Sequence, residues 1–200
     1  MIIALSQFDT GISKEFYRKA FMSQSLSKAA DNFGETFGWG YFAGAGLISF
    51  ESLISRNSST EYFTKLELLL ESIAVTQIIT QTLKLSTQRM RPNFSDDHSF
   101  PSGHTSSTFA MAASLNGIYG WQAGIPAYVL ASIVGLQRIN SNAHYLSDVL
   151  SGALIGTLVG QGFSSIHHQN KNDAPMLNTF FFFDSRSYAL QANVVFRLNL

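Results

Sequence analysis

The sequence predicts a mainly α-helical protein, a compact bundle of about six helices with a C-terminal β-hairpin. Apolar residues make up 46% of the 200 residues and charged residues only 13%, roughly half the charged share of a soluble globular protein. Residues 105–137 and 149–170 contain no Asp, Glu, Lys or Arg. After residue 177 the chain changes character, and residues 190–198 show an alternation that is typical of β-strands.

Three segments make up the N-terminal half. Residues 14–30 are expected to form an amphipathic helix. Residues 33–50 are rich in glycine and aromatic side chains. We expect the aromatic side chains in the core; a groove that accepts a lipid is the alternative. Thr60 opens a long helix with one inward face. This helix should end near Met90, because Pro92 disfavours helical backbone at the residue before it.

Three shorter helices follow, at 103–115, 126–138 and 145–163. In the tail, residues 178–183 and 188–200 flank the turn sequence Asp184-Ser-Arg-Ser187, which predicts the β-hairpin. We therefore expect residues 1–170 to form one helical domain. Residues 171–200 should form a linker and a hairpin that packs on the same domain.

The low charge raises the question of a membrane. A spanning helix needs about 20 mostly apolar residues. Residues 105–137 are interrupted at Asn116-Gly117, Gly120 and Gly124-Ile-Pro126, which leaves helical pieces of about 12 to 15 residues. Residues 149–170 carry Ser, Thr and Gln, and the mean hydropathy of the chain is only +0.10. We therefore favour the buried helices of a compact bundle over a spanning protein, and peripheral association with a membrane would fit as well.

Charge and cysteine content narrow the class further. The formal net charge is zero, so we expect no nucleic-acid partner. The absence of cysteine excludes disulfides, thiolate metal sites and cysteine catalysis. Residues 1–5 lack the basic region and the length of a signal peptide, so either the protein is cytoplasmic or a leader is absent from this sequence. We expect the second case, with the protein in a bacterial periplasm or cell envelope; the oligomeric state stays undetermined.

Two cations form the first candidate site. Lys84 and Arg91 are seven residues apart, so two helical turns would bring them onto one face of the long helix. Neighbouring cations repel each other unless an anion lies between them. Taken alone, a solvated basic patch that includes Arg89 would explain this pair more simply.

The second candidate site is Pro101-Ser-Gly-His104, at the junction of a polar loop and a helix. Free backbone N–H groups and the helix dipole at such a junction favour an anion. Gly103 would let the backbone approach a ligand closely, and Ser102 can donate a hydroxyl. An ordinary capping turn would explain the tetrapeptide if it stood alone.

The third candidate site combines a histidine with a carboxylate. His144 and Asp148 are four residues apart, so the carboxylate can hold the Nδ1–H group and leave Nε2 as a nucleophile. His104 is the available group to protonate a leaving oxygen. The planar fork of Arg138 can bind two phosphoryl oxygens at once. Together the three segments indicate a site for a phosphate ester.

The three segments Lys84-x6-Arg91-Pro92, Pro101-Ser-Gly-His104 and Arg138-x5-His144-x3-Asp148 resemble the signature motifs of the type 2 phosphatidic acid phosphatase (PAP2) superfamily. That superfamily includes bacterial class A acid phosphatases and vanadium haloperoxidases, and its fold is an α-helical bundle. One position departs from the pattern. The third motif usually begins Ser-Arg, and Gln137 stands in place of the serine. Because an amide can still donate a hydrogen bond, we expect tuning of the site rather than its loss.

The resemblance implies a metal-independent phosphatase that acts on a phosphate monoester or pyrophosphate, with a lipid phosphate as the expected substrate. His144 would attack phosphorus and form a phosphohistidine, and Asp148 would orient and stabilise it. His104 would protonate the leaving group and then activate water. The phosphoryl oxygens would be held by Lys84, Arg91, Ser102, Gly103 and Arg138. The resemblance implies no cofactor and no metal.

Other interpretations stay open. Asp96, Asp97 and His98 resemble a metal cluster, although a solvated loop explains them better. A vanadium-dependent haloperoxidase is an alternative, because vanadate can occupy the same oxyanion site, but those enzymes are much longer chains. A catalytically silent binding or membrane-scaffold protein of the same fold is another alternative, which the complete set of motif residues disfavours.

Overall fold

The computed structural model describes residues 9–11, 15, 22–34, 39–55, 58–168, 177–184 and 189–196. Side chains are described for these residues with the exception of residues 34, 39–41 and 168 and those of the two strands. In this part of the chain the protein is mainly α-helical, as the sequence predicts.

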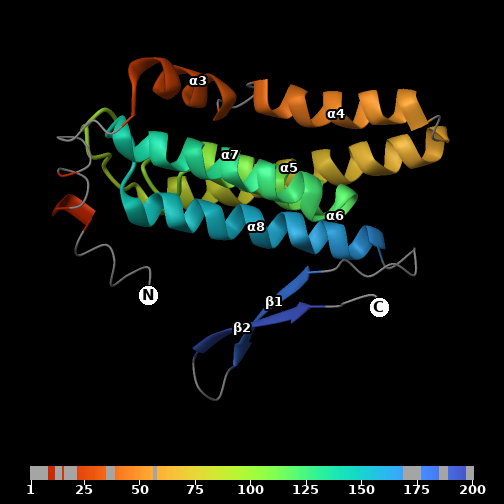
Figure 1. Ribbon diagram of the computed structural model, residues 1–200. Helices are drawn as coiled ribbons and strands as arrows, with labels where there is room; N and C mark the ends of the chain where they lie inside the picture. Colours follow the sequence, from red (N-terminus) through yellow and green to blue (C-terminus); the bar gives the residue numbers. More distant parts are fainter. Residues whose placement is uncertain are drawn as a thin grey trace.

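The long helices form a bundle that is followed by two strands (Figure 1). The helices are α3 (Gln24–Gly34), α4 (Trp39–Ser55), α5 (Ser59–Thr87), α6 (Gly103–Tyr119), α7 (Trp121–Asn140) and α8 (Leu146–His168). The strands β1 (Leu177–Asp184) and β2 (Ala189–Phe196) are antiparallel, with Leu177 opposite Phe196. Their side chains lie outside the described residues. The predicted hairpin therefore gains no support from packing, and its place on the helical domain stays a prediction.

Helix α6 lies at the centre of the bundle. It packs most extensively against α8 and α7 and also against α5, while α3 lies on α7 and α4 on α5. In Figure 1, α3 and α4 run along one side of the bundle and α8 along the other. The buried core joins four helices through Ile48, Leu69, Met111, Leu115 and Ala131. The loops that follow α5 and α7 meet at the same end of the bundle (Figure 1).

Glycines let α8 approach α6 closely. Gly152, Gly156 and Gly160 recur every four residues and therefore share one face of α8. A Cβ atom at Gly152 would lie 2.6 Å from the Ser102 carbonyl oxygen, and one at Gly156 would collide with the carbonyl oxygen of Ser106. Close backbone approach of this kind needs small residues. It brings the first turn of α8 against the loop before α6, where the Ser102 N–H donates to the Asp148 carbonyl at 3.0 Å.

A row of buried hydroxyls joins α5 to α6. Ser72 lies 2.7 Å from the hydroxyl of Ser114, and Thr80 lies 2.9 Å from that of Ser106. These pairs satisfy groups that would be costly to bury alone. Lys84 is one turn beyond Thr80 on the same face of α5 and is buried as well. The hydroxyl row therefore fixes the rotation of α5 that points Lys84 toward the start of α6.

The prediction that Lys84 and Arg91 share a helix face is wrong. Helix α5 ends at Thr87, because Gln88 takes a left-handed conformation (φ 45°, ψ 42°) and its N–H donates to the Lys84 carbonyl. Arg91 lies in the following loop, where its N–H donates to the Asp96 carbonyl at 3.0 Å. Pro92 explains why no helix continues through Arg91, but the end of α5 is set three residues earlier.

The predicted boundaries of the neighbouring helices also differ from the structure. Helix α7 begins at Trp121 rather than at Pro126, because Gly120 (φ 73°) ends α6 and allows α7 to start at once. Helices α6 and α7 are therefore 17 and 20 residues long, more than the short pieces expected. In the N-terminal segment, α3 begins only at Gln24, after a bend at Met22. Most of the remainder of the helix predicted at 14–30 lies outside the described residues.

Two helices of the described chain are long and apolar enough to cross a membrane by length and composition. They are α5 and residues 146–167 of α8. In the most apolar 18-residue stretch of each helix, 28% and 33% of the residues are buried inside the protein. The expectation against a spanning protein rested on breaks in residues 105–137 and on the polar residues of 149–170. The structure weakens that argument, because α7 runs unbroken through Gly124-Ile-Pro126 and residues 146–167 qualify in spite of their polar side chains.

Candidate active site

His144 lies in the short turn between α7 and α8 and is 2% exposed. Its Nδ1 is 2.7 Å from the carbonyl oxygen of Ser99. Because a carbonyl oxygen only accepts, Nδ1 carries the proton. Nε2 is then unprotonated, and its lone pair accepts from Nη1 of Arg91 at 3.2 Å. This is the tautomer that a nucleophilic Nε2 requires.

Asp148 does not hold the imidazole in the way that the four-residue spacing predicts. Its Oδ2 is 3.7 Å from Nδ1 of His144, which is too far for an ordinary hydrogen bond. The carboxylate instead accepts from the Ser99 hydroxyl at 2.5 Å and from the Tyr145 N–H at 2.9 Å. The second contact caps the first turn of α8. Asp148 therefore fixes Ser99, and the Ser99 carbonyl fixes the ring.

Lys84 and Arg91 reach the same site from different elements. Nζ of Lys84 donates to the His98 carbonyl at 2.5 Å. Nε of Arg91 donates to Oδ1 of Asp96 at 2.7 Å, while its Nη1 faces His144. The two cations thus lie beside the loop that contains Ser99, although they do not share a helix.

Arg138, in the last turn of α7, forms an ion pair with Asp31 of α3. The preceding Gln137 is 3% exposed, and its amide donates to the Ser27 hydroxyl at 3.4 Å. Both contacts join the end of α7 to α3. The described partner of the Gln137 amide is thus a side chain of α3, and its effect on the phosphate site stays a prediction.

Ser102 and Gly103 stand where the loop enters α6. Ser102 is fully buried, and its hydroxyl oxygen accepts from Thr105 at 2.9 Å. A Cβ atom at Gly103 would lie 3.8 Å from Cε of Lys84 and from Cγ2 of Thr80. The Lys84 side chain therefore runs past the backbone of Gly103, and the cation and the N-terminus of α6 lie side by side.

His104, in the first turn of α6, has a buried Nε2 without a hydrogen-bond partner among the described residues. Burial lowers the pKa of His104 to about 3, helped by the positive charges of Arg138, Arg91 and Lys84. The second histidine behaves similarly. Burial lowers the pKa of His144 to about 4, against the attraction of the Asp148 carboxylate. Both imidazoles are therefore neutral at pH 7. The charges of Lys84 and Arg91 act on both histidines, which shows that these predicted site residues lie near one another.

Three residues of this end of the bundle were missed by sequence reasoning. Arg89 pairs with both Asp9 and Asp148, and Ser99 carries the carbonyl that orients His144. From the sequence, Arg89 was interpreted only as part of a basic patch. Asp9 is 80 residues away from Arg89, and Ser99 is one of several polar residues in a loop, so no spacing pattern could link them to the site.

Among the described residues, no group of three or more His, Asp or Glu side chains could hold a metal ion. Asp96 pairs with Arg91, and His98 lies 2.9 Å from Asp97. Both aspartates and His98 have partly exposed side chains, in agreement with a solvated loop.

Comparisons with known proteins agree with the motifs. Residues 65–172 match the model of the PAP2 superfamily. A lipid A 1-phosphatase of Porphyromonas gingivalis is 42% identical over 81 residues, which cover 39% of this chain and 18% of that protein. Lipid phosphate phosphatase 1 of Arabidopsis thaliana is 31% identical over 133 residues, covering 46% of this chain and 41% of that protein. The chain spans less than half the length of these curated relatives.

Two solved structures share the fold. The crystal structure of LpxE from Aquifex aeolicus aligns with a TM-score of 0.58 at 22% identity and covers 79% of this chain and 95% of that one. A transmembrane PAP2-type phosphatidylglycerolphosphate phosphatase from Bacillus subtilis aligns with a TM-score of 0.64 at 21% identity, covering 86% and 90%. At these identities the likeness is one of fold.

Proposed function

This chain belongs to the PAP2 superfamily, and from that premise we propose that it is a phosphatase that hydrolyses a phosphate monoester or pyrophosphate of a lipid. The observation that carries the proposal is the ring of His144. Its Nδ1–H donates to the Ser99 carbonyl, so the lone pair of Nε2 lies beside the guanidinium of Arg91. A nucleophile next to a phosphate-binding cation is what phosphoryl transfer to a protein nitrogen needs.

In the proposed reaction, Nε2 of His144 attacks phosphorus, and the bond from phosphorus to the leaving oxygen breaks. A phosphate dianion beside His104 raises the pKa of its imidazole, so His104 takes up a proton when the substrate binds. It then gives that proton to the leaving oxygen. In the second half, His104 takes a proton from water, the water oxygen attacks phosphorus, and the bond between phosphorus and Nε2 breaks. Phosphate leaves and His144 is restored.

Positive charge around the phosphoryl group comes from the chain itself. Lys84, Arg91 and Arg138 would hold the phosphoryl oxygens, together with Ser102 and the backbone N–H of Gly103 at the start of α6. Asp148 acts through Ser99 to orient His144. We propose that the reaction needs no metal, and we expect phosphate release to persist in EDTA.

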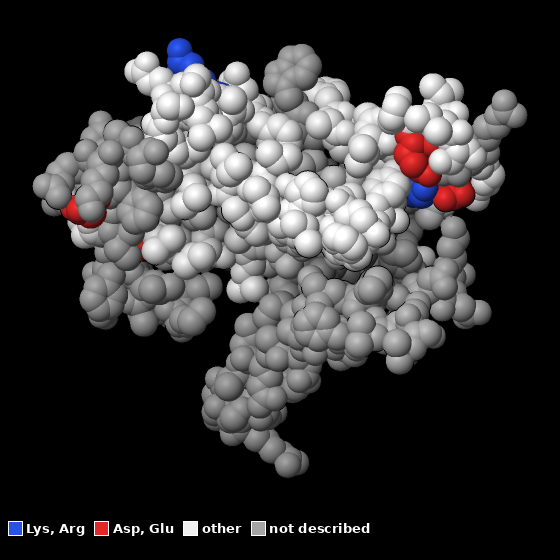
Figure 2. All heavy atoms as spheres, in the orientation of Figure 1, with Lys and Arg blue, Asp and Glu red and all other residues white. Residues whose placement is uncertain are grey.

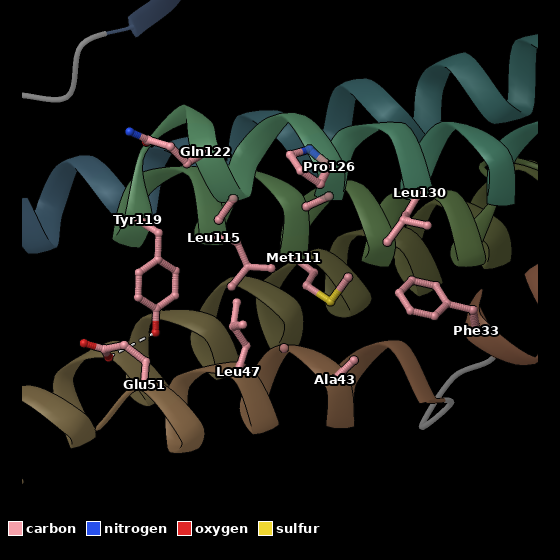
Figure 3. A pocket seen from close by; sticks show the side chains of 13 residues that line it. Phe33, Ala43, Leu47, Glu51, Met111, Leu115, Tyr119, Gln122, Pro126 and Leu130 are labelled. Atoms are coloured by element: carbon pink, nitrogen blue, oxygen red, sulfur yellow. Dashed lines mark hydrogen bonds between the residues drawn. The ribbon is translucent and has the colours of Figure 1, made fainter. Parts of the chain in front are cut away.

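A cavity supports a lipid as the substrate. A space of about 530 Å³ lies between α4 on one side and α6 and α7 on the other, and Figure 3 shows its apolar lining. Phe33 and Leu130 stand at one end, and Tyr119 stands at the other with its hydroxyl 3.4 Å from Glu51. From Leu130, α7 continues for eight residues to Arg138, about 12 Å along the helix axis. An acyl chain in the cavity would thus lead toward the phosphate site.

The names of the relatives support the same substrate class. The two curated relatives are a lipid A 1-phosphatase and a lipid phosphate phosphatase. None of the four reported relatives has the name of a haloperoxidase. We propose a membrane-associated enzyme of a bacterial cell envelope, with the periplasmic side as the place of its active site.

Phosphate release from p-nitrophenyl phosphate and from phosphatidate tests the reaction. We expect the wild-type chain to release phosphate from both, and His144→Ala to lose at least about 10³-fold in kcat, since the nucleophile is gone. Acid-labile ³²P on the wild-type protein, absent from His144→Ala, would report the phosphohistidine. Equal rates for wild type and His144→Ala would end the proposal.

Filling the cavity tests the lipid. Ala43 lines the cavity from α4, so Ala43→Trp should raise KM for a long-chain phosphatidate by about 10-fold, the loss expected for about two buried CH₂ groups. KM for p-nitrophenyl phosphate should stay unchanged. Phe50→Trp, on an exposed position of the same helix, serves as the control. An unchanged KM for both substrates in Ala43→Trp would exclude this cavity as the acyl site.

A further inference from the structure

The guanidinium of Arg89 contacts four side chains at the loop end of the bundle. Its Nη1 donates to Oδ1 of Asp148 at 2.6 Å and to the Ser147 hydroxyl at 2.7 Å, and its Nη2 donates to Oδ2 of Asp9 at 2.8 Å. The guanidinium also lies over the ring of Tyr145, 4.1 Å from the centroid. Arg89 therefore faces the protein and not a ligand, unlike the cation of a solvated patch.

Asp9 completes this arrangement from the N-terminal segment. It is 1% exposed, and its carboxylate also accepts from the Ser147 N–H at 3.1 Å and from the Ser147 hydroxyl. A buried carboxylate is costly unless it is paired and hydrogen-bonded. Asp9 fulfils both conditions through contacts to Arg89 and to the first turn of α8.

The backbone of Arg89 leads to His144 by a second route. The carbonyl of Arg89 accepts from the Ser99 N–H at 2.9 Å. The carbonyl of the same Ser99 accepts from Nδ1 of His144 at 2.7 Å, and its hydroxyl donates to Asp148. Arg89 therefore restrains Ser99 in two ways. Its side chain binds Asp148, which accepts from the Ser99 hydroxyl, and its backbone carbonyl accepts from the Ser99 N–H.

We propose that Arg89 and Asp9 are positioning residues for the proposed phosphatase reaction, which clamp Asp148 and the Ser99 loop so that the Ser99 carbonyl aims Nε2 of His144 at phosphorus. The inference rests on the proposed function. Arg89 and Asp9 do not contact the reacting atoms. They act through Asp148 and Ser99, whose carboxylate and carbonyl oxygens lie 3.7 Å and 2.7 Å from Nδ1 of His144.

The clamp requires the shape of an arginine as well as its charge. Two N–H groups of one planar fork reach the two carboxylates, and a lysine offers one point charge in place of this fork. Misplacement of a reacting group by about 1 Å can cost about 10²-fold in rate. The cations that hold the phosphoryl group are other residues, so loss of the clamp should leave substrate affinity unchanged.

The test compares Arg89→Lys and Asp9→Asn with Lys65→Met in the full chain. Lys65 is a matched control, because its Nζ also bridges two carboxylates, Glu51 at 2.8 Å and Glu61 at 3.0 Å, away from the site. With p-nitrophenyl phosphate we expect kcat to fall about 10- to 100-fold in Arg89→Lys and Asp9→Asn, with KM within about twofold of wild type. Lys65→Met should match wild type in both constants.

A second measurement is independent of turnover. ¹⁵N-edited NMR of His144 should show a protonated, hydrogen-bonded Nδ1 in the wild type and in Lys65→Met. In Arg89→Lys and Asp9→Asn the Nδ1–H signal should broaden or be lost to exchange with water. An unchanged signal together with an unchanged kcat in Arg89→Lys would overturn the clamp, as would a rise in KM with kcat unchanged. Failure of the proposed function looks different, because wild type and His144→Ala would then be equally inactive while the Nδ1–H signal still responds to Arg89→Lys.

Discussion

Each cation predicted to bind phosphate already contacts an oxygen of the protein. Lys84 donates to a carbonyl, while Arg91 and Arg138 pair with Asp96 and Asp31. A phosphate that enters the site must compete with these oxygens. The Asp31 and Asp96 side chains are both 42% exposed, so each carboxylate is a modest competitor. Asp31 belongs to a different helix from the site residues, which allows its charge to be removed without changing the loop that contains Arg91 and Ser99.

Removal of the Asp31 charge should therefore strengthen anion binding. We expect Asp31→Asn to lower the inhibition constant of inorganic phosphate by about two- to fivefold, the range set by an exposed ion pair. Arg138→Lys should raise it, because the planar fork is lost. Asp97→Asn changes a carboxylate of similar exposure that pairs with His98 and serves as the control. Weaker phosphate inhibition in Asp31→Asn would show that Asp31 helps to bind the ligand.

The low pKa of His104 predicts proton uptake when an anion binds. With a pKa of about 3, His104 is neutral at pH 6.5, and a dianion beside it raises that pKa, so the imidazole takes up a proton. Sulfate is a suitable probe because it does not titrate near neutral pH. Calorimetry in two buffers of different ionisation enthalpy should give uptake of a fraction of a proton in the wild type. Uptake should be smaller in His104→Gln, where only His144, with its pKa of about 4, can still take up a proton. Proton release on sulfate binding would contradict the assignment.

At the scale of elements, the contact between α8 and α6 places the site. The start of α8 carries Asp148, and the loop before α6 carries Ser102, whose N–H donates to the Asp148 carbonyl. Three glycines on one face of α8 allow this approach. The separation of α8 from α6 therefore controls the geometry around His144.

A methyl group on this face should be destabilising. A Cβ atom at Gly156 would collide with the Ser106 carbonyl and lie 2.8 Å from the Ala110 nitrogen. We expect Gly156→Ala to reduce the free energy of unfolding by about 1–3 kcal/mol. Gly162→Ala is the control on the same helix, since nothing lies within 4 Å of its Cβ position, and it should be neutral or stabilise by up to about 1 kcal/mol. Thermal unfolding of both variants measures the difference, and equal melting temperatures would contradict the close packing.

At the scale of the whole molecule, apolar side chains cover much of the exterior. The face in Figure 2 is nearly free of charged side chains along the described helices, and its charges gather toward the ends. Large exposed side chains occur on several helices, among them Phe42, Leu53, Phe63, Ile78 and Ile166. An apolar surface of this extent marks contact with a membrane or with another protein. Together with α5 and α8, it favours a membrane.

We therefore expect the chain to stay with membranes. After expression in bacteria, it should sediment with the membrane fraction and dissolve only in detergent. Extraction of the membranes at alkaline pH distinguishes peripheral from spanning association. A peripheral protein is released into the supernatant, while a spanning protein stays in the pellet. Quantitative recovery in the soluble fraction without detergent would contradict the expectation.

The sequence alone determined the class and the candidate residues. Charge-poor segments with helical spacing predict the bundle, and the intervals between Lys84, Arg91, His104, Arg138 and His144 carry the family resemblance. These signals are local, because backbone periodicity and motif spacing depend on residues that are close in the chain. The family match over residues 65–172 agrees with them.

Only the tertiary structure decided which groups touch. The spacing of His144 and Asp148 predicts a direct hydrogen bond, whereas the Ser99 carbonyl takes that place. The left-handed Gln88 moves Arg91 off the helix, and Asp9 reaches Arg89 from 80 residues away. Such contacts depend on how α8 packs on α6 and on where the loops cross. A pattern along the chain records which residue types are present, but partners far apart in sequence are chosen by packing.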